Sequence, residues 1–289
     1  MKKSLILLSL FILFSANAHA FTRSNFETPE SFVIDPADGS YYVSNIVGGP
    51  LDKDANGYIS KINHNGNIVI QKFIEGKKSH ATIHAPKGLL IKNNELWVTD
   101  IDSVHIFNKK TAKLIRNLDF SAFSVKFLND IALGMDEKVF VSDMFTDQIF
   151  LVDPKNSYHI SVYKSGSELG NPNGLLFNPK TKSLMVVTFK SGQILEIDRQ
   201  KKVHVLKRGL TSLDGIDYDN EGSLFVSSFE KGEIYRIPYM GRGSLSTFMG
   251  ELITPADISC DRQNNELLIP SFKGNTVTTV FLYDNKPKK

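Results

Sequence analysis

A short pattern that recurs six times along the chain restricts the fold more than any other feature. Each copy is a turn that leads into an apolar run, and the copies read PESFVI from Pro29, PKGLLI from Pro86, LNDIAL from Leu128, PNGLLF from Pro172, LDGIDY from Leu213 and PADISC from Pro255. Their second residues, Glu30, Lys87, Asn129, Asn173, Asp214 and Ala256, are 57, 42, 44, 41 and 42 positions apart. Self-similarity at such a period is typical of solenoids and propellers.

Further apolar runs follow each start. A second run begins in the six units at Ser40, Glu95, Lys138, Ser183, Ser223 and Glu266. A third run follows in every unit, and a fourth is visible in five units. The runs are rich in β-branched and aromatic residues, which indicates strands, and no segment has a sustained helical period. The chain is therefore predicted to be all-β, a six-bladed β-propeller with four-stranded antiparallel blades.

The sixth unit lacks a fourth run before the polar tail at 284–289, whereas residues 21–26 precede the first unit without a partner. We predict that this N-terminal segment supplies the missing outer strand and closes the ring. The alternative, an open solenoid, would leave two exposed strand edges that promote aggregation.

Residues 1–20 have the layout of a secretory signal peptide. Lys2 and Lys3 give a positive start, residues 4–14 are almost wholly apolar, and Ala18 and Ala20 are small residues at the cleavage positions. We expect cleavage after Ala20, which leaves 21–289 as the propeller in a periplasmic or secreted location. An uncleaved anchor is the alternative, but a bilayer span needs ~20 apolar residues, so we expect no stable membrane insertion after cleavage.

Charge and cysteine content narrow the range of partners. The formal net charge is +3, Lys2 and Lys3 supply two of these charges, and the chain has no long run of like charge. No nucleic-acid partner is therefore expected. Cys260 is the only cysteine, which excludes an internal disulfide and a thiolate metal cluster. We expect a monomer that acts on a small-molecule substrate.

The second residues of the six units are predicted to surround the mouth of the central tunnel. Four of them carry side-chain oxygens: Glu30, Asn129, Asn173 and Asp214. Converging carboxylate and amide oxygens suit a hard divalent cation such as Ca²⁺ or Mg²⁺. The alternative is that these residues cap local backbone groups, as Asn and Asp do where a turn enters a strand.

The second runs end at Asn45, Asp100, Asp143, Phe189, Phe229 and Phe272. One side of the mouth is thus predicted to be polar and the other aromatic, which suits a ligand with a polar head and an apolar body. Asp143, Phe189 and Phe229 are therefore candidates, with Asn129, for substrate binding. The alternative is that the aromatic side chains seal neighbouring blades.

The chain resembles the gluconolactonase, senescence marker protein (regucalcin) and luciferin-regenerating enzyme family, and more distantly the paraoxonases and diisopropyl fluorophosphatase. The resemblance covers all six repeats and is carried by Glu30 in PESFVID, Asn129-Asp130 in FLND, Asn173 in PNGL and Asp214 in LDGID. It implies that Glu30, Asn173 and Asp214 bind a divalent cation, with Asn129 as a ligand or close neighbour. It also implies that Asp214 is a catalytic general base. Ca²⁺ is the expected ion, and Mg²⁺, Mn²⁺ and Zn²⁺ are alternatives.

Lys87 departs from the pattern that the resemblance implies, because the paraoxonases have a catalytic His at the matching position. An ammonium group there has three possible roles. It acts on the substrate as a catalytic group, it pairs with Glu30 or Asp214, or it displaces the metal.

The long first unit contains DKDANGYI from Asp52, which is similar to the start of an EF-hand loop. The position that needs a bidentate Glu holds Asn63 instead, and strands rather than helices flank the loop. We therefore expect a solvated turn or lid that overhangs the tunnel mouth, with a structural Ca²⁺ site as the alternative.

Two functions remain open. The first is an exported metal-dependent hydrolase of lactones or related esters, with its site at the tunnel mouth. The second is a non-catalytic propeller, like the NHL-repeat proteins, that binds a small ligand, a peptide or a partner protein. A fold alone does not choose between an enzyme and a binding module.

Overall fold

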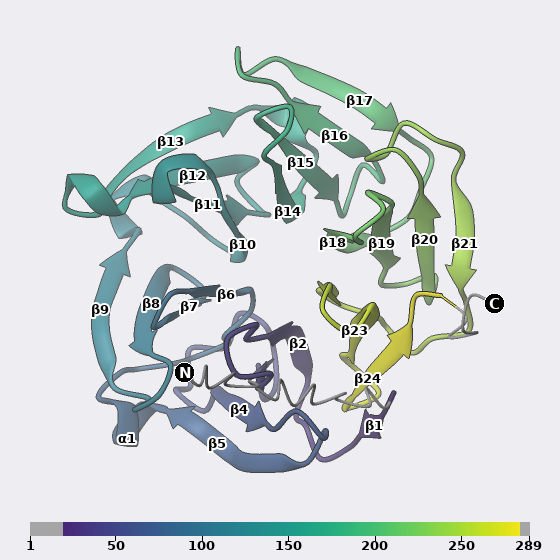
Figure 1. The fold of residues 1–289 in the computed structure, drawn as a ribbon. Coiled ribbons are helices and arrows are strands. Elements are labelled where there is room, and N and C mark those ends of the chain that lie inside the picture. Colours follow the sequence, from purple (N-terminus) through teal and green to yellow (C-terminus); the bar gives the residue numbers. More distant parts are fainter. Residues whose placement is uncertain (1–19, 284–289) are drawn as a thin grey trace, which may run out of the picture.

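Six four-stranded antiparallel sheets surround a central tunnel, which confirms the predicted six-bladed propeller (Figure 1). The structure is a computed structural model and describes residues 20–283. Residues 1–19 of the predicted signal peptide lie outside the described residues. Apart from short 3-10 turns, the described part of the chain has one helix, α1 (Gly76–Ser79), a single turn after β5. None of the described helices has the length and apolar character needed to cross a membrane.

Within each blade the strands follow chain order outward from the tunnel. Blade 1 contains β2 (Pro29–Ile34), β3 (Tyr41–Asn45), β4 (Tyr58–Ile62) and β5 (Ile68–Glu75). Blade 2 contains β6 (Leu89–Lys92), β7 (Glu95–Thr99), β8 (Ser103–Asn108) and β9 (Leu114–Asp119). Blade 3 contains β10 (Leu128–Leu133), β11 (Val139–Asp143), β12 (Gln148–Asp153) and β13 (His159–Ser165).

The remaining blades repeat this order, except for the last outer strand. Blade 4 contains β14 (Pro172–Asn178), β15 (Ser183–Thr188), β16 (Ile194–Ile197) and β17 (Val203–Lys207). Blade 5 contains β18 (Leu213–Tyr218), β19 (Leu224–Ser228), β20 (Glu233–Ile237) and β21 (Ser246–Met249). Blade 6 contains β22 (Ser259–Asp261), β23 (Glu266–Ser271) and β24 (Thr276–Phe281), and its outer strand is β1 (Thr22–Arg23).

The core lies between adjacent blades rather than at the centre of the ring. Six hydrophobic clusters each join side chains of two neighbouring blades; Trp97 and Val104 of blade 2, for example, belong to one cluster with Val141 and Phe150 of blade 3. Burial of these faces stabilises the fold through the removal of apolar surface from water. Because every sheet packs on two neighbours, an incomplete ring would leave two apolar faces exposed.

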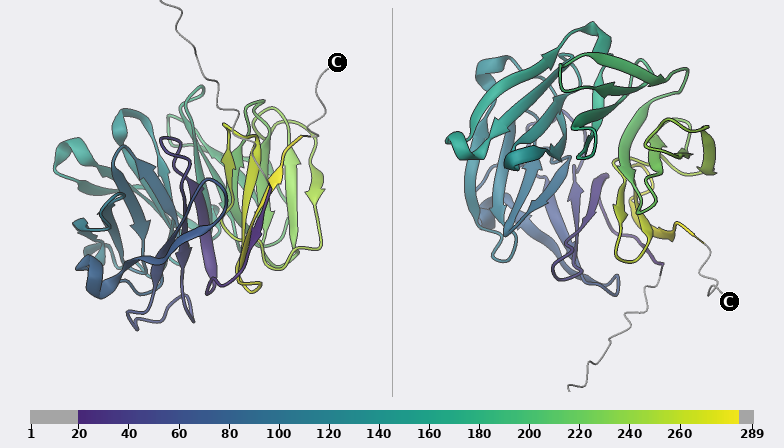
Figure 2. Two further views of the ribbon diagram at one scale, coloured as in Figure 1. Left: turned by 60° about the horizontal axis from the view of Figure 1, so that its bottom comes forward. Right: turned by 45° about the horizontal axis from the view of Figure 1, so that its top comes forward.

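The N-terminal segment closes the ring as predicted. Strand β1 pairs with β24 in antiparallel register, with Thr22 opposite Thr278, and Thr279 N donates to Phe21 O at 2.8 Å. Figure 2 shows this purple strand beside the yellow strands of the last blade. Phe21 and Phe26 are buried in a cluster that also holds Tyr41 of blade 1. The segment therefore joins blade 6 to blade 1 by both hydrogen bonds and apolar packing.

Glu266, at the start of β23, is a buried carboxyl group in this closing blade. The residue is 1% exposed, and its Oε1 has no hydrogen-bond partner within residues 20–283. Burial, with a smaller contribution from Asp261 on β22, raises the pKa of Glu266 from 4.5 to about 7. The folded state therefore holds a proton that the unfolded chain releases at lower pH.

Deletion of residues 21–26 should lower the melting temperature by roughly 10 °C, because two buried Phe side chains contribute about 4 kcal/mol together. The matched control is Thr22→Ala, since Thr22 is exposed and its main-chain pairing survives the change. Differential scanning calorimetry measures both. An unchanged transition after the deletion would contradict closure by this segment.

Glu266→Gln should remove one pH-dependent loss of stability. In the wild type, the Glu266 carboxyl is protonated in both the folded and the unfolded state below about pH 4.5, and it then costs no stability. As the pH rises from about 4.5 to about 7, the free energy of unfolding falls, because only the unfolded chain releases this proton easily. The variant should therefore be more stable than the wild type at pH 8, by on the order of 3 kcal/mol, and nearly equal at pH 4. Urea unfolding at the two pH values measures the difference, with the exposed Glu251→Gln as control. A constant difference across pH would refute the assignment.

Candidate functional site

Four of the six inner strands are irregular at the same place, just after their first residue. The pairing of β2 with β3 shifts between Pro29 and Phe32, and equivalent shifts occur in β10, β14 and β18. The four predicted oxygen ligands, one per strand, lie within these shifts. A bulge changes the direction of a side chain relative to the regular alternation. The side chains of Glu30, Asn129, Asn173 and Asp214 all line one cavity at this end of the tunnel.

Hydroxyl groups of the second strands hold the bulged residues in place. Ser142 Oγ accepts a hydrogen bond from Asp130 N at 3.0 Å and donates one to Asn173 O of the next blade at 2.8 Å. Ser227 makes the equivalent pair of bonds in blade 5, where it reaches blade 6. Each hydroxyl thus satisfies a main-chain group that the bulge leaves unpaired and connects two blades.

Glycines next to the ring allow the inner strands to approach closely. A Cβ atom on Gly174 would lie 2.3 Å from Asp214 O, and one on Gly215 would lie 2.2 Å from Ile258 N. Both distances are to main-chain atoms of the following blade, which cannot move aside. A larger residue at either position would therefore widen the ring that places the oxygen ligands.

The cavity at the tunnel mouth has a volume of about 300 Å³, the lower end of the range for small-molecule sites. Its floor is formed by the six residues predicted to surround the mouth: Glu30, Lys87, Asn129, Asn173, Asp214 and Ala256. Its walls are mostly apolar and are formed by Ile46, Pro50, Leu51, Phe127, Met144, Phe145, Phe189, Phe229 and Phe272, together with Lys273. The cavity therefore combines a polar floor with apolar walls.

Three of the four predicted ligands have a buried oxygen without a hydrogen-bond partner among the described residues: Glu30 Oε2, Asn129 Oδ1 and Asp214 Oδ1. Asn129 Nδ2 donates to Asn173 Oδ1, which leaves the Asn129 oxygen free. A buried unsatisfied oxygen costs about 1–3 kcal/mol. A bound cation or an ordered water in the cavity would satisfy these three atoms.

Burial also acts on the two carboxyl groups. It raises the pKa of Glu30 well above its usual value, and Asp257 and Asp214 raise it further, while Lys87 lowers it. It raises the pKa of Asp214 as well, with a further increase from Asp257 and an opposing hydrogen bond from Asn173. Ionisation of Glu30 and Asp214 is therefore energetically costly unless a cation lies beside them, and without one they tend to stay protonated.

These residues fit a hard divalent cation. The free atoms are two carboxylate oxygens and one amide oxygen, the donors that Ca²⁺ and Mg²⁺ prefer. Within residues 20–283, no group of three or more His, Cys, Asp and Glu side chains is arranged to hold a metal ion. A cation at the floor would thus depend on the Asn oxygens as well as on Glu30 and Asp214, as the sequence predicts.

Lys87 lies on the floor beside these groups. Its side chain is 1% exposed, and Nζ donates to Ala85 O at 2.8 Å and lies 4.6 Å from the centre of the Phe127 ring. The ion pairs of the described residues do not include Lys87, so it forms no direct pair with Glu30 or Asp214. Of the three roles that the sequence leaves open, pairing with a carboxylate of the ring is not what the structure shows.

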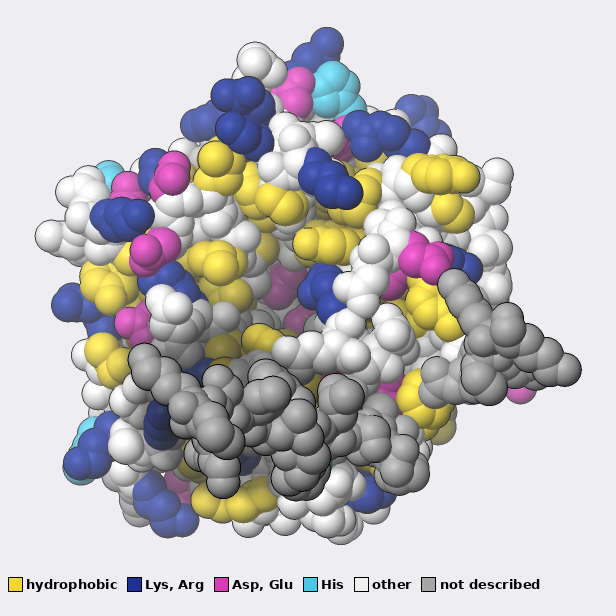
Figure 3. Space-filling model, viewed as in Figure 1, with side chains coloured by type: hydrophobic (Ala, Val, Ile, Leu, Met, Phe, Trp, Pro, Cys, Tyr) yellow, Lys and Arg dark blue, Asp and Glu magenta, His cyan; other side chains and the backbone are white. Residues whose placement is uncertain are grey.

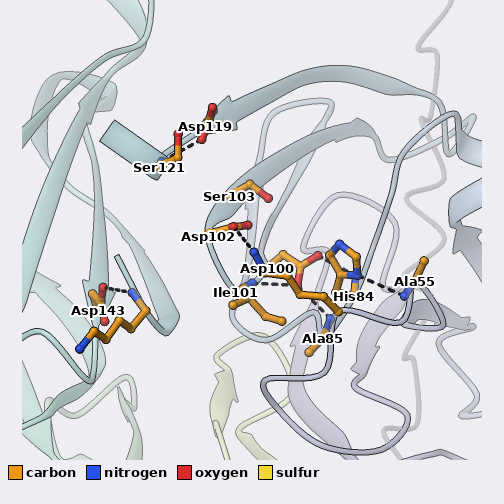
Figure 4. A network of polar contacts seen from close by, with 12 residues as sticks. Ala55, His84, Ala85, Asp100, Ile101, Asp102, Ser103, Asp119, Ser121 and Asp143 are labelled. Carbon is orange, nitrogen blue, oxygen red and sulfur yellow. Dashed lines mark hydrogen bonds and ion pairs between the residues drawn. The ribbon is translucent and has the colours of Figure 1, made fainter. Parts of the chain in front are cut away.

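Asp100 and Asp143, at the ends of the second strands of blades 2 and 3, hold the loops that precede the inner strands (Figure 4). Asp100 accepts hydrogen bonds from His84 N at 2.7 Å and Ala85 N at 2.8 Å. The Asp143 carboxylate accepts four main-chain N–H groups, from Lys126, Phe127, Phe145 and Thr146. Asp143 is fully buried and is not among the residues that line the cavity. The structure thus places this predicted substrate-binding residue behind the wall, where it positions Phe127 and Phe145.

The predicted aromatic side of the mouth is present. Phe189 and Phe229 line the cavity with ring centres 6.1 Å apart, and Phe272 follows Phe229 at 5.5 Å. Phe127 and Phe145 complete the wall as a stacked pair at 4.7 Å. The sequence comparison of the repeats missed this pair, because both residues lie just outside the aligned runs.

The long loop of blade 1 contributes Pro50 and Leu51 to the wall. In its EF-hand-like part, Ala55 N donates to His84 Nδ1 at 3.1 Å (Figure 4). Lys53 Nζ lies 2.5 Å from Asp102 Oδ2 of blade 2. Asp52 accepts a hydrogen bond from Gly49 N. The start of the loop therefore borders the mouth cavity, whereas its exposed EF-hand-like part lies against residues of the neighbouring blade.

The other end of the tunnel opens on the opposite face. Figure 3 shows yellow hydrophobic side chains around a hollow with acidic side chains inside it. This second cavity has a volume of about 530 Å³, and its acidic lining residues are Asp130, Asp217, Asp257 and Asp261. Asp257 accepts a hydrogen bond from Ser31 Oγ at 2.6 Å. Asp257, which raises the pKa of both Glu30 and Asp214, thus lines the cavity at the other end of the tunnel.

No family model matches the chain, and no curated protein matches it. Among solved structures, virginiamycin B lyase from Staphylococcus aureus matches with a TM-score of 0.64 and 14% identity, over 92% of this chain and 100% of that one. A streptogramin B lyase matches with a TM-score of 0.61 and 13% identity, over 91% and 96%. A protein of unknown function from Bacteroides thetaiotaomicron matches with a TM-score of 0.65 and 12% identity, over 91% and 72%. Identities this low show the six-bladed propeller fold alone, and the resemblance to the gluconolactonase family stays a prediction.

Asp143→Ala should lower the free energy of unfolding by about 3 kcal/mol, because it leaves several loop N–H groups without an acceptor. Chemical denaturation measures the loss, and Asp102→Ala is the control, since the Asp102 carboxylate is partly exposed and, among the described residues, bonds the Lys53 side chain rather than main-chain N–H groups. Unchanged stability together with weaker ligand binding would instead support direct substrate contact by Asp143.

Proposed function

We propose that the chain is an exported, metal-dependent hydrolase that opens lactones or related esters at the tunnel mouth. The observation that carries the proposal is the set of three unpartnered buried oxygens, on Glu30, Asn129 and Asp214, around the floor of one cavity. A site of this kind is costly to maintain without a ligand. Ca²⁺ is the first candidate for that ligand.

A divalent cation held by Glu30, Asn129, Asn173 and Asp214 would supply Lewis acidity toward a carbonyl oxygen. The chain's own residues would perform the remaining steps. Asp214 would accept the proton of the attacking water as general base. The ammonium group of Lys87 would stabilise negative charge that develops on the substrate oxygen. Lys87 and Asp214 lie on the same floor, so both would reach one substrate.

The walls indicate which lactones or esters fit. Five Phe side chains and Leu51 surround the floor, and such surfaces bind apolar groups by removing them from water. A polyhydroxylated sugar lactone would lose hydrogen bonds to water against these walls. We therefore propose substrates with a polar carbonyl head and an apolar body, which Phe189, Phe229 and Phe145 would contact.

The structural neighbours are compatible with an enzyme. Three of them are lyases, and one of these, a catalytically inactive virginiamycin B lyase, was solved with quinupristin, at a TM-score of 0.60 and 13% identity to this chain. The alternative function, a non-catalytic NHL-like propeller, uses the same cavity for binding without turnover. Whether the protein binds a divalent cation separates the two.

Asp214→Asn keeps the shape of the side chain but removes a charge and the basic group. It should reduce hydrolysis of an apolar lactone by at least about 100-fold, the scale of a lost general base, and weaken Ca²⁺ binding. Isothermal titration measures the binding, and a pH indicator measures the hydrolysis.

Asp52→Asn is the matched control, because Asp52 lies in the exposed EF-hand-like loop. It should bind Ca²⁺ as the wild type does. Loss of Ca²⁺ binding in this variant rather than in Asp214→Asn would move the ion to the loop. A wild type that binds no divalent cation and opens no lactone across a broad panel would favour the binding propeller.

A further inference from the structure

Lys87 differs from the other buried lysine that the structure places in the fold. Lys109 is 6% exposed, and its Nζ lies 2.5 Å from Asp35 Oδ2 in a direct ion pair. Lys87 is more deeply buried, yet among the described residues its Nζ has only a main-chain oxygen, Ala85 O, and the face of Phe127 as close partners. Within the described part of the chain, no carboxylate lies within ion-pair distance of the Lys87 ammonium group. The neutral amine form of Lys87 is therefore more favourable than that of Lys109.

The electrostatics agree with this geometry. Burial lowers the pKa of Lys87 to about 8, although Asp100 and Glu30 oppose the shift. An exposed lysine has a pKa of about 10.4, so at pH 7 the neutral fraction of Lys87 exceeds that of a surface lysine by roughly two orders of magnitude. A desolvated lysine of this kind is a nucleophile.

We propose that Lys87 captures aldehydes or ketones with an apolar body as a reversible imine at the floor of the mouth cavity. This activity is separate from the proposed hydrolysis and needs no metal. The Nζ lone pair attacks the carbonyl carbon and forms a C–N bond, and the carbonyl oxygen becomes a hydroxyl as it takes a proton from the nitrogen. Loss of that hydroxyl with the second N–H proton, as water, gives the C=N bond. Addition of water reverses the sequence.

The cavity selects the carbonyl compound. The side chain of Phe127 lies against Nζ, and Phe145, Phe189 and Leu51 form walls around it, so an aromatic or aliphatic body would lose water-exposed surface on entry. An acidic compound would lose the hydration of its charge against the apolar walls, which is costly. The expected ligand class is therefore neutral, apolar aldehydes and ketones.

The test uses benzaldehyde with sodium cyanoborohydride, which reduces an imine to a stable secondary amine. The purified protein is treated at pH 7 in the presence of EDTA with limiting benzaldehyde, and the modified lysines are identified by peptide mass mapping. Lys87 should be modified at least tenfold faster than any other lysine. Its rate should level off near pH 8, whereas surface lysines continue to react faster at higher pH.

Two variants make the result specific. Lys87→Arg should lose the fast modification while it keeps the charge, and Lys273→Arg, at the rim of the same cavity, should retain it at Lys87. A measurement on the wild type alone covers the case in which Lys87→Arg does not fold: excess benzyl alcohol should slow modification of Lys87 and leave surface lysines unaffected.

Even modification across all lysines, or no effect of benzyl alcohol, would overturn the proposal. Because the assay contains no lactone and no free metal, its outcome is independent of the hydrolysis experiment. Fast capture by a protein that opens no lactone would leave this inference standing and remove only the proposed hydrolase.

Discussion

The close approach of neighbouring inner strands around the tunnel is the constraint on which the rest of the structure depends. Gly174 and Gly215 leave no room for a Cβ against the main chain of the next blade, and Ser142 and Ser227 bridge one blade to the next through their hydroxyl groups. These contacts fix the width of the ring. With the width fixed, one bulge per blade is enough to bring side chains from four blades to a single cavity.

That cavity combines features that oppose each other energetically. Carboxyl groups and amide oxygens are buried with incomplete hydrogen bonding beneath walls of Phe side chains. Apolar walls strengthen every electrostatic interaction at the floor, because they exclude water and lower the local dielectric constant. The same walls raise the energetic cost of polar atoms on the floor that have no hydrogen-bond partner. A fold retains such a floor at the expense of stability, which is the usual signature of a functional site.

The sequence predicted the blades, their strands and the closing segment, because strand alternation and repeat spacing depend on local residue types. It also predicted which four oxygen-bearing residues meet, since equivalent positions of a ring are equidistant from its axis. The role of Asp143 was not accessible in this way, because a carboxylate at a strand end looks the same whether it faces a cavity or holds a loop. Phe127 and Phe145 were missed because they lie outside the repeated runs. Gly174 and Gly215 were not singled out, because their importance lies in contacts between blades that no local sequence pattern shows.

Closure by β1 affects the order in which the parts of the chain fold. Most strand pairs join neighbours in sequence, but β1 pairs with β24, and Asp257 N of blade 6 donates to Glu30 O of blade 1 at 2.9 Å. Long-range contacts of this kind form late, since they wait for the whole chain. During synthesis the first blades can pair their strands while Phe21 and Phe26 have nothing to pack on. The N-terminal residues 21–26 are thus synthesised early but pack last. In a chain that ends before its sixth blade, Glu30 would lack the main-chain partner that Asp257 provides in the complete ring.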